Sequence, residues 1–126
     1  MDRTQLNLVS GAVVDSAIAV HRELGPGLLE SAYEACLFFE LKARGIAVHR
    51  QVELPIEYRG HRIETAYRLD LLVEQLVVLE LKAVQAITDI HRTQLLSYLK
   101  LSKKPLGLLM NFNVELMKHG ITRIAN

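Results

Sequence analysis

The sequence has little cysteine and no long hydrophobic run. Its single cysteine, Cys36, cannot form a disulfide within the 126-residue chain, which fits a reduced setting and a core position for this thiol. No segment reaches the ~18 to 20 consecutive apolar residues that a membrane-spanning helix needs. Polar residues interrupt the N-terminal segment, which is unlike a signal peptide. We therefore expect a cytoplasmic protein that has no membrane partner.

Two other common kinds of site are also missing. Structural zinc is not expected, because the histidines share no ligand-like spacing and only one cysteine is present. The histidines are His21, His49, His61, His91 and His119. The chain has no glycine-rich loop that could cradle phosphates, which excludes nucleotide hydrolysis of the P-loop kind. With 50% hydrophobic and 23% charged residues, the composition is that of a globular protein, and the length predicts a single domain over residues 1–126.

The net charge is only +1, but the charges are unevenly distributed. Residues 1–89 hold 9 Lys/Arg and 13 Asp/Glu, whereas residues 90–126 hold 6 Lys/Arg and a single Glu. Acidic residues beside a basic surface would suit a metal site that also holds a phosphate backbone. A random fluctuation of surface charge explains the same numbers.

Three segments have helical spacing. Apolar residues recur every three or four positions over 5–24, and Gly25-Pro26-Gly27 ends this helix because proline cannot continue it. The same spacing predicts a second helix over 29–44, capped by Gly45. A third helix is expected from about residue 88 to 101.

The middle of the chain changes to the period of a strand. Residues 46–58 alternate between apolar and polar side chains, and Pro55 indicates an edge strand or a bulge. Arg59-Gly60 predicts a tight turn, after which residues 61–67 return as a second strand.

The most apolar part of the chain consists of residues 70–73 and 76–82, joined by a tight turn at 74–75. Its long apolar run predicts a central strand that is covered on both faces. Residues 106–112 have the same buried-strand pattern, and a short hairpin is expected around 119–120. The predicted order is ααβββββαββ, an α/β (α+β) fold in which helices flank a mixed central sheet.

Charged residues stand at the end of this central hairpin. Glu80 and Lys82 continue a strand face that is otherwise apolar, and Asp70 falls opposite residue 79 or 80 if the strands pair through the tight turn. Poorly solvated charges cost several kcal/mol, as an order of magnitude, unless they are paired or bind a metal. Oxygen ligands favour Mg²⁺ or Mn²⁺. An ordinary salt bridge between Glu80 and Lys82 is the simpler alternative.

Several short motifs occur in an order that resembles the GxxExxY family. The matching segments are Gly27–Tyr33, Tyr67–Val73, Glu80–Lys82, Gln94–Tyr98 and Asn111–Phe112. The likeness extends from about residue 8 to residue 124. This family is similar to a compact branch of the PD-(D/E)xK nuclease superfamily, so the resemblance implies a restriction-endonuclease-like core. Leu69 stands where the superfamily name has proline, which is not a metal ligand.

The resemblance also implies roles for single residues. Asp70 and Glu80 match the metal-binding acids, and the backbone carbonyl of Leu81 matches a further ligand. Lys82 matches the catalytic lysine. Glu30 matches an acid on the preceding helix that completes the metal site, directly or through water.

The same resemblance implies partners and a cofactor. Gln94 and Tyr98 match a helix that orders the site and contacts nucleic acid, and the implied cofactor is Mg²⁺ or Mn²⁺. The substrate would be nucleic acid, DNA rather than RNA, and related nucleases work as homodimers or with partners. Basic side chains that could contact phosphates, or simply be solvated, are Arg59, Arg62, Lys100, Lys103 and Lys104.

Three functions therefore stay open at the level of sequence. The first is a metal-dependent nuclease that hydrolyses phosphodiester bonds. The second is a non-catalytic binding or assembly module on the same fold. The third is a nucleic-acid binder that does not cleave.

Overall fold

Two helices begin the chain in the computed structural model, which describes residues 2–126. They are α1 (Arg3–Leu24) and α2 (Glu30–Ala43). Gly25 ends α1 with φ at 70°, and its N–H donates to the carbonyl of His21 at 2.7 Å. Glycine adopts this left-handed backbone without strain, so the predicted end of the helix is confirmed.

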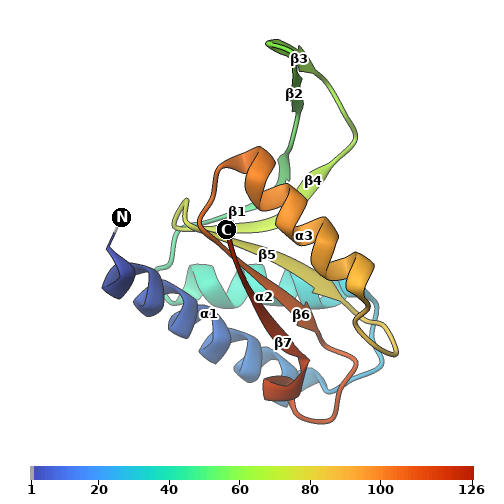
Figure 1. The fold of residues 1–126 in the computed structure, drawn as a ribbon. Helices are drawn as coiled ribbons and strands as arrows, with labels where there is room; N and C mark the ends of the chain where they lie inside the picture. Colours follow the sequence, from blue (N-terminus) through green and yellow to red (C-terminus); the bar gives the residue numbers. More distant parts are fainter. Residues whose placement is uncertain (1) are drawn as a thin grey trace.

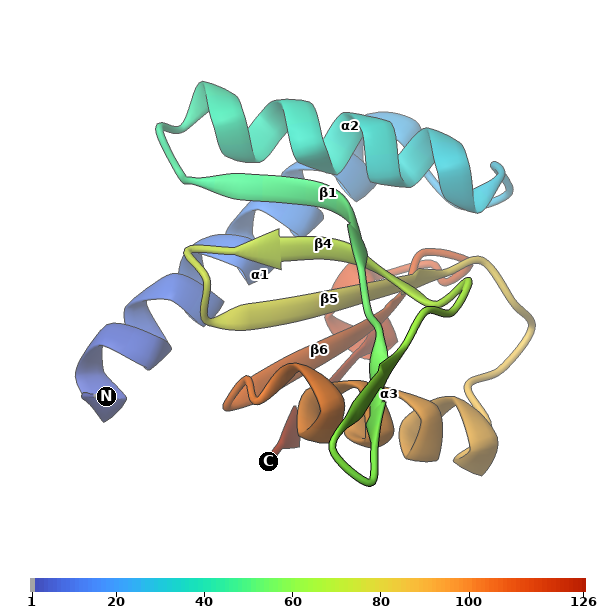
Figure 2. The same cartoon turned by 90° about the horizontal axis from the view of Figure 1, so that it is seen from above.

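The central sheet has five strands in the order β1-β4-β5-β6-β7. The strands are β1 (Val48–Glu53), β4 (Arg68–Val73), β5 (Val77–Lys82), β6 (Leu106–Asn111) and β7 (Ile121–Ala125). Only β5 and β6 are parallel neighbours, so the sheet is mixed. Helices α1 and α2 cover one face, and α3 (Asp89–Ser102) covers the other (Figure 2). This arrangement confirms the predicted restriction-endonuclease-like fold.

A hydrophobic core lies on each face of the sheet, and β5 contributes to both. Leu79 and Leu81 pack toward α1 and α2, whereas Val78 packs toward α3. Each such buried side chain stabilises the fold by about 2 kcal/mol. On β6, Gly107 lets α3 approach closely, because a Cβ there would lie 3.0 Å from the side chain of Leu95. The predicted central strand is confirmed.

A separate hairpin projects from the body of the molecule (Figure 1). It consists of β2 (Ile56–Tyr58) and β3 (His61–Ile63), which pair only with each other among residues 2–126. Arg59 and Gly60 connect them with φ of 50° and 79°. Two successive positive φ values match the right-handed twist of the strands, so the predicted turn is confirmed.

The first predicted strand is longer than the observed one. Residues 46–58 are divided into β1, which ends at Glu53, and β2, which begins at Ile56. Pro55 lies at the break because it has no N–H to donate to a strand neighbour. The proline predicted an edge strand or a bulge, and β1 is an edge strand of the central sheet.

Two other expectations need correction. The strand expected over 61–67 stops at Ile63, and the chain then crosses irregularly to β4. The hairpin expected around 119–120 is wrong: Met117–Gly120 form a short 3₁₀ helix, and the single strand β7 then pairs with β6. No helix within residues 2–126 combines the length and hydrophobicity needed to cross a membrane.

Candidate metal centre

Strands β1 and β4 both exchange the faces on which their side chains are buried, at one position beside the end of β5. Gln51 on β1 has φ at 53°, and it stands opposite Asp70 on β4 by the register of the paired residues on either side. Val48 packs toward α1 and α2, but Val52, beyond the kink, packs toward α3. A positive φ at a non-glycine residue is strained and is common at functional sites. The two strands stay paired on either side of this position, so the kink turns side chains to the other face beside Asp70 without ending the β1–β4 pairing.

Where β4 and β5 separate, the side chains of Asp70 and Glu80 accept hydrogen bonds from backbone N–H groups of the opposite strand. The last regular pair is Leu71 with Leu79, so the next position sets Asp70 opposite Glu80, one of the two pairings that the sequence left open. Asp70 Oδ2 accepts the N–H of Leu81 at 2.8 Å, and Glu80 Oε1 accepts the N–H of Asp70 at 3.3 Å. Each carboxylate thus binds the backbone of the opposite strand, which holds the two acids next to each other.

Burial makes this pair of acids unfavourable when both are charged. Glu80 is only 7% exposed, and its pKa is raised to about 9, first by loss of solvent and then by the negative charge of Asp70. The pKa of Asp70 is also raised, again mainly by burial, against the lowering effect of the hydrogen bond from Leu81. In the absence of a cation, Glu80 therefore keeps its proton at neutral pH.

Lys82 is close to both acids without being paired to either. Its positive charge lowers the pKa of Asp70 and of Glu80, but it takes part in none of the ion pairs formed by residues 2–126. The alternative of an ordinary salt bridge between Glu80 and Lys82 is therefore wrong. The spacing of two residues puts both side chains on one face of β5, but does not bring their charged ends together.

Glu30 reaches the same end of β5 from the start of α2. Its Oε2 accepts the N–H of Ala83, the residue after Lys82, at 3.4 Å. The Glu30 side chain is otherwise exposed to solvent. Its contact with β5 is therefore one residue beyond Lys82, next to the segment that carries the two acids.

Tyr33 explains the spacing of the first motif. This fully buried side chain donates from its hydroxyl to the carbonyl of Gly25 at 2.6 Å and accepts the N–H of Leu28 at 3.1 Å. Its ring stacks on Phe112 with centroids 4.5 Å apart. Tyr33 thus fixes the turn that leads into α2, and this turn sets the position of Glu30.

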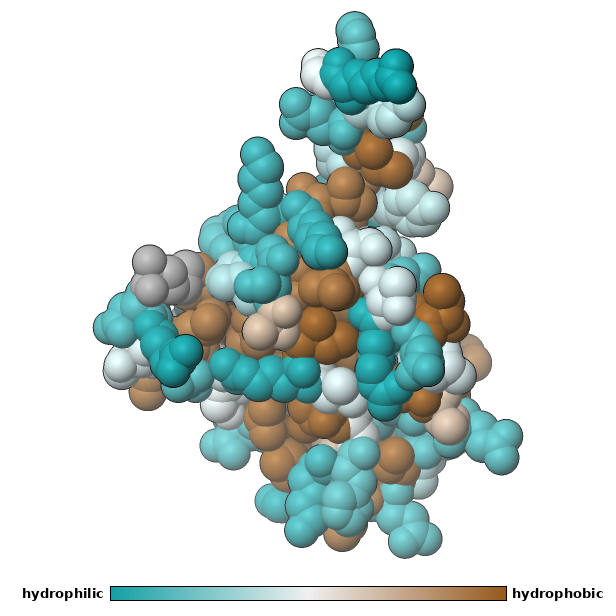
Figure 3. Space-filling view, in the orientation of Figure 1, coloured by the Kyte–Doolittle hydropathy of each residue, from teal (hydrophilic) through white to brown (hydrophobic). Residues whose placement is uncertain are grey.

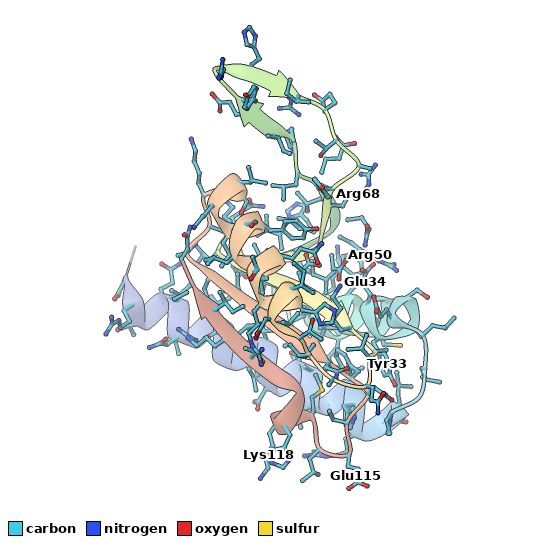
Figure 4. The ribbon with its side chains drawn as sticks, turned by 45° about the vertical axis from the view of Figure 1, so that its right-hand side comes forward. Tyr33, Glu34, Arg50, Arg68, Glu115 and Lys118 are labelled. Atoms are coloured by element: carbon cyan, nitrogen blue, oxygen red, sulfur yellow. The ribbon has the colours of Figure 1, made fainter. Side chains whose placement is uncertain are left out.

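Glu34 is the residue of this region that sequence reasoning missed. It is 8% exposed, and its carboxylate accepts from Arg50 Nε at 2.7 Å and from Gln51 Nε2 at 2.8 Å. Figure 4 shows Glu34 and Arg50 next to each other. The negative charge of Glu34 contributes to the raised pKa of Asp70. Its spacing of four residues from Glu30, hence one helix face, was the available signal.

Asn111 holds the segment that follows Lys82. This buried amide accepts the N–H of Val84 at 3.1 Å and donates to the carbonyl of Val84 at 2.9 Å. The same oxygen accepts the N–H of Asn113 at 3.2 Å. Asn111 stands beside Lys82 in the register of β5 and β6. The late motif of the sequence therefore shapes the loop at the end of the candidate site.

Helix α3 places Tyr98 beside the acids. Tyr98 packs against the cluster that contains Leu69, the residue before Asp70, and Val78, two residues before Glu80. The pKa of Tyr98 is raised by burial and then by the negative charges of Glu80, Tyr67 and Asp70. The ring of Tyr98 lies 6.0 Å from that of Tyr67. Gln94 is exposed one helical turn before Tyr98. The structure thus brings Tyr98 to the site, while Gln94 lies at its solvent side.

The donor set fits a hard cation with few protein ligands. Within residues 2–126, no three His, Cys, Asp or Glu side chains form a cluster that could enclose a metal. Mg²⁺, however, is commonly bound by one or two carboxylates and keeps several waters. Asp70 and Glu80 supply two carboxylates. The N–H and C=O of a strand residue point to the same edge, so the carbonyl of Leu81 faces the gap that holds Asp70.

Most of the candidate phosphate contacts line a groove that neighbours the acids but does not include them. Arg62, Lys100, Lys103 and Lys104 line a groove of about 810 Å³ between the hairpin and the last turn of α3. Arg59 is not part of it, because its guanidinium lies over the ring of Tyr58 at the turn of the hairpin, 5.4 Å from the centroid.

The mixed sheet between helices defines a nuclease-type fold, and two facing acids and a lysine lie at the end of its central strand. A family model described as the PD-(D/E)XK nuclease superfamily matches residues 7–124, and the chain belongs to this superfamily. Searches of curated proteins and of solved structures found no match. Membership points to nuclease activity and to a nucleic-acid substrate. Nucleases of this superfamily generally use divalent metals.

Proposed function

We propose that the protein is a metal-dependent nuclease of the GxxExxY type that hydrolyses phosphodiester bonds, with DNA as the expected substrate. One observation supports this most strongly. Two carboxylates face each other where β4 and β5 separate, with an unpaired lysine beside them. Such a group of charges destabilises a fold unless a cation or a substrate compensates it.

Each residue has a role in this proposal. Asp70, Glu80 and the carbonyl of Leu81 would hold Mg²⁺ or Mn²⁺, with Glu30 acting through water. The ion would lower the pKa of a water molecule and neutralise charge on the phosphate. Lys82, which is free of ion pairs within residues 2–126, orients the attacking water or donates to the phosphate in the transition state.

The residues around the acids support the same function. Tyr98 limits solvent on the α3 side, and Gln94 stands where a bound strand would enter. Tyr33 and Asn111 fix the two segments that carry Glu30 and the end of β5. The assignment to the GxxExxY type rests on the order of the motifs, of which those that carry Glu30, Asp70, Glu80 and Asn111 contact the same end of β5.

Cleavage of labelled single-stranded, nicked and linear DNA, and of RNA, with Mg²⁺ or Mn²⁺ tests the proposal. We expect Lys82→Ala to lower the rate by about 100-fold or more, because a group that stabilises the transition state is lost. Glu80→Gln should have a similar effect. The control variants Glu23→Gln and Lys118→Ala change exposed residues away from the site and should cleave like the natural chain.

Calorimetry with Mn²⁺ separates the nuclease from a non-catalytic module. Uptake of Mn²⁺ that is lost in Asp70→Asn supports the metal site. No cleavage of any substrate, together with no uptake of Mn²⁺, would exclude the nuclease and favour a binding or assembly module. Sedimentation of the same samples tests the expected homodimer.

A further inference from the structure

A groove whose charged side chains are mainly basic lies beside the candidate metal centre. One wall is the projecting hairpin, which supplies Arg62, and the other is the end of α3, which supplies Lys100, Lys103 and Lys104. Glu53 and Glu57 are its two acidic residues, so basic side chains predominate. Within residues 2–126, none of the three lysines takes part in an ion pair, although Arg62 binds Glu64.

The groove begins one residue away from the metal centre on β4 and one helical turn away from Tyr98 on α3. Leu69, the residue before Asp70, forms part of its floor together with Leu72. On α3, Leu101 and Ser102 line the groove one helical turn after Tyr98, which is next to the acids. A chain bound at the acids could therefore pass over Tyr98 directly into the groove.

Two aromatic rings stand at this passage. Tyr67 is 47% exposed, and its ring lies 6.0 Å from that of Tyr98. Hydrophobic surface gathers where the hairpin joins the body, and hydrophilic residues cover the tip (Figure 3). Exposed rings beside a basic groove are the features by which proteins bind single strands, since bases stack on the rings and phosphates follow the charges.

The size of the groove favours a single strand over a duplex. A volume of about 810 Å³ lies within the range of about 300 to 1,000 Å³ that is typical of pockets for a single small ligand. A double helix would have to stay outside the hairpin. A flexible strand of a few nucleotides fits within it.

We propose that the groove between the β2–β3 hairpin and the end of α3 binds single-stranded nucleic acid next to the cleavage site. The phosphates lie along Lys100, Lys103 and Lys104, and a base stacks on Tyr67. This inference rests on the proposed nuclease function, because it assigns the strand that enters that site. It predicts a preference for single strands, or for the unpaired ends of duplexes.

Binding without cleavage tests the groove separately from catalysis. Fluorescence anisotropy in EDTA measures the affinity for a labelled single strand of roughly 12 nucleotides, a length within the range of single-strand sites. The double variant Lys100→Ala/Lys104→Ala removes two charges from the groove. It keeps Lys103, whose backbone has the left-handed conformation that ends α3. The control Arg22→Ala/Lys118→Ala removes two exposed charges elsewhere; Figure 4 shows Lys118 at the end of the molecule far from the hairpin.

We expect the groove variant to bind about tenfold more weakly and the control to bind normally. Each lysine that no longer neutralises a phosphate of a single strand should lower the slope of log affinity against log salt by about 0.7, so the double variant should lower it by about 1.4. Tyr67→Ala should weaken binding about tenfold because the variant has no ring for a base to stack on, and Tyr67→Phe should restore it.

Several results would overturn the inference. The first is equal or tighter binding of a matched duplex. The second is binding that is weakened equally in the control variant. The third is displacement of the strand by polyglutamate at equal charge concentration, because this result would indicate that the groove binds an acidic peptide. Cleavage by the natural chain with unchanged binding in the groove variant would refute the groove and leave the nuclease standing. Single-strand binding that depends on the groove, in a chain that never cleaves, would refute the nuclease alone.

Discussion

Replacing Glu80 by glutamine should stabilise the metal-free protein at alkaline pH. The unfolded chain releases the proton of Glu80 near pH 4.5, whereas the folded chain holds it up to a pKa of about 9. Between these values the folded state binds one more proton, so this group stabilises the fold fully below pH 4.5 and loses that effect as the pH rises toward 9. Glutamine is neutral at every pH and keeps an oxygen for the N–H of Asp70.

The size of the effect follows from the pKa difference. One extra bound proton changes the free energy of unfolding by about 1.4 kcal/mol for each pH unit, so the three units from pH 5 to pH 8 amount to about 4 kcal/mol. Small domains are stable by about 5 to 15 kcal/mol, so this difference is large enough to measure. The free energy of unfolding of Glu80→Gln, relative to that of the natural chain, should therefore rise by about 4 kcal/mol from pH 5 to pH 8.

Urea unfolding followed by circular dichroism, in EDTA at several pH values, measures this difference. Glu23→Gln is the matched control, because it removes an exposed carboxylate from α1. Addition of Mn²⁺ at pH 8 should reverse the order, since the cation stabilises an ionised Glu80 and finds one ligand fewer in the variant. Parallel pH profiles for the natural chain and Glu80→Gln would refute the account of a buried, protonated acid.

Two further predictions concern the residues that shape the site. Tyr33→Phe keeps the ring on Phe112 but loses both hydrogen bonds of the hydroxyl, so we expect about 2 kcal/mol less stability in urea unfolding; an unchanged midpoint would show that water replaces them. Asn111→Ala frees both polar groups of Val84, so hydrogen exchange at the Val84 amide should become at least tenfold faster while amides in the middle of β4 keep their protection. Unchanged exchange at Val84 would contradict the role of Asn111.

Much of the fold and part of the site could be predicted from local patterns. The hydrophobic hairpin was predicted, but its turn has three residues, 74–76, instead of the expected two, so β5 begins at Val77. This length sets Asp70 opposite Glu80, whereas a two-residue turn would set it opposite Leu79. The strand period sets Glu80 and Lys82 on one face. The absence of an ion pair between them within residues 2–126 could not be predicted, because the spacing of two residues says nothing about the direction of a long, flexible side chain.

Other features depend on contacts between distant segments. The kink at Gln51 has no sequence pattern, since glutamine rarely adopts a positive φ. Glu34 has the spacing of an ordinary helix residue, and only the packing of α2 against β1 buries it beside Arg50. A hairpin was expected around residues 119–120, but Met117–Gly120 form a 3₁₀ helix. The strand that follows, β7, pairs with β6 and not with a strand formed by the residues just before it.

The sequence by itself determined the order of helices and strands, the central hydrophobic hairpin and the identity of the facing acids. These depend on periodicity and on one short turn, which act over a few residues. Tertiary structure decided that Glu80 is buried and Asp70 half-buried, that Glu34 lies near Asp70, and that Arg62 meets the lysines of α3 across a groove. Burial, charge and grooves arise only when surfaces from distant parts of the chain come together, because each is a property of the surroundings of a side chain.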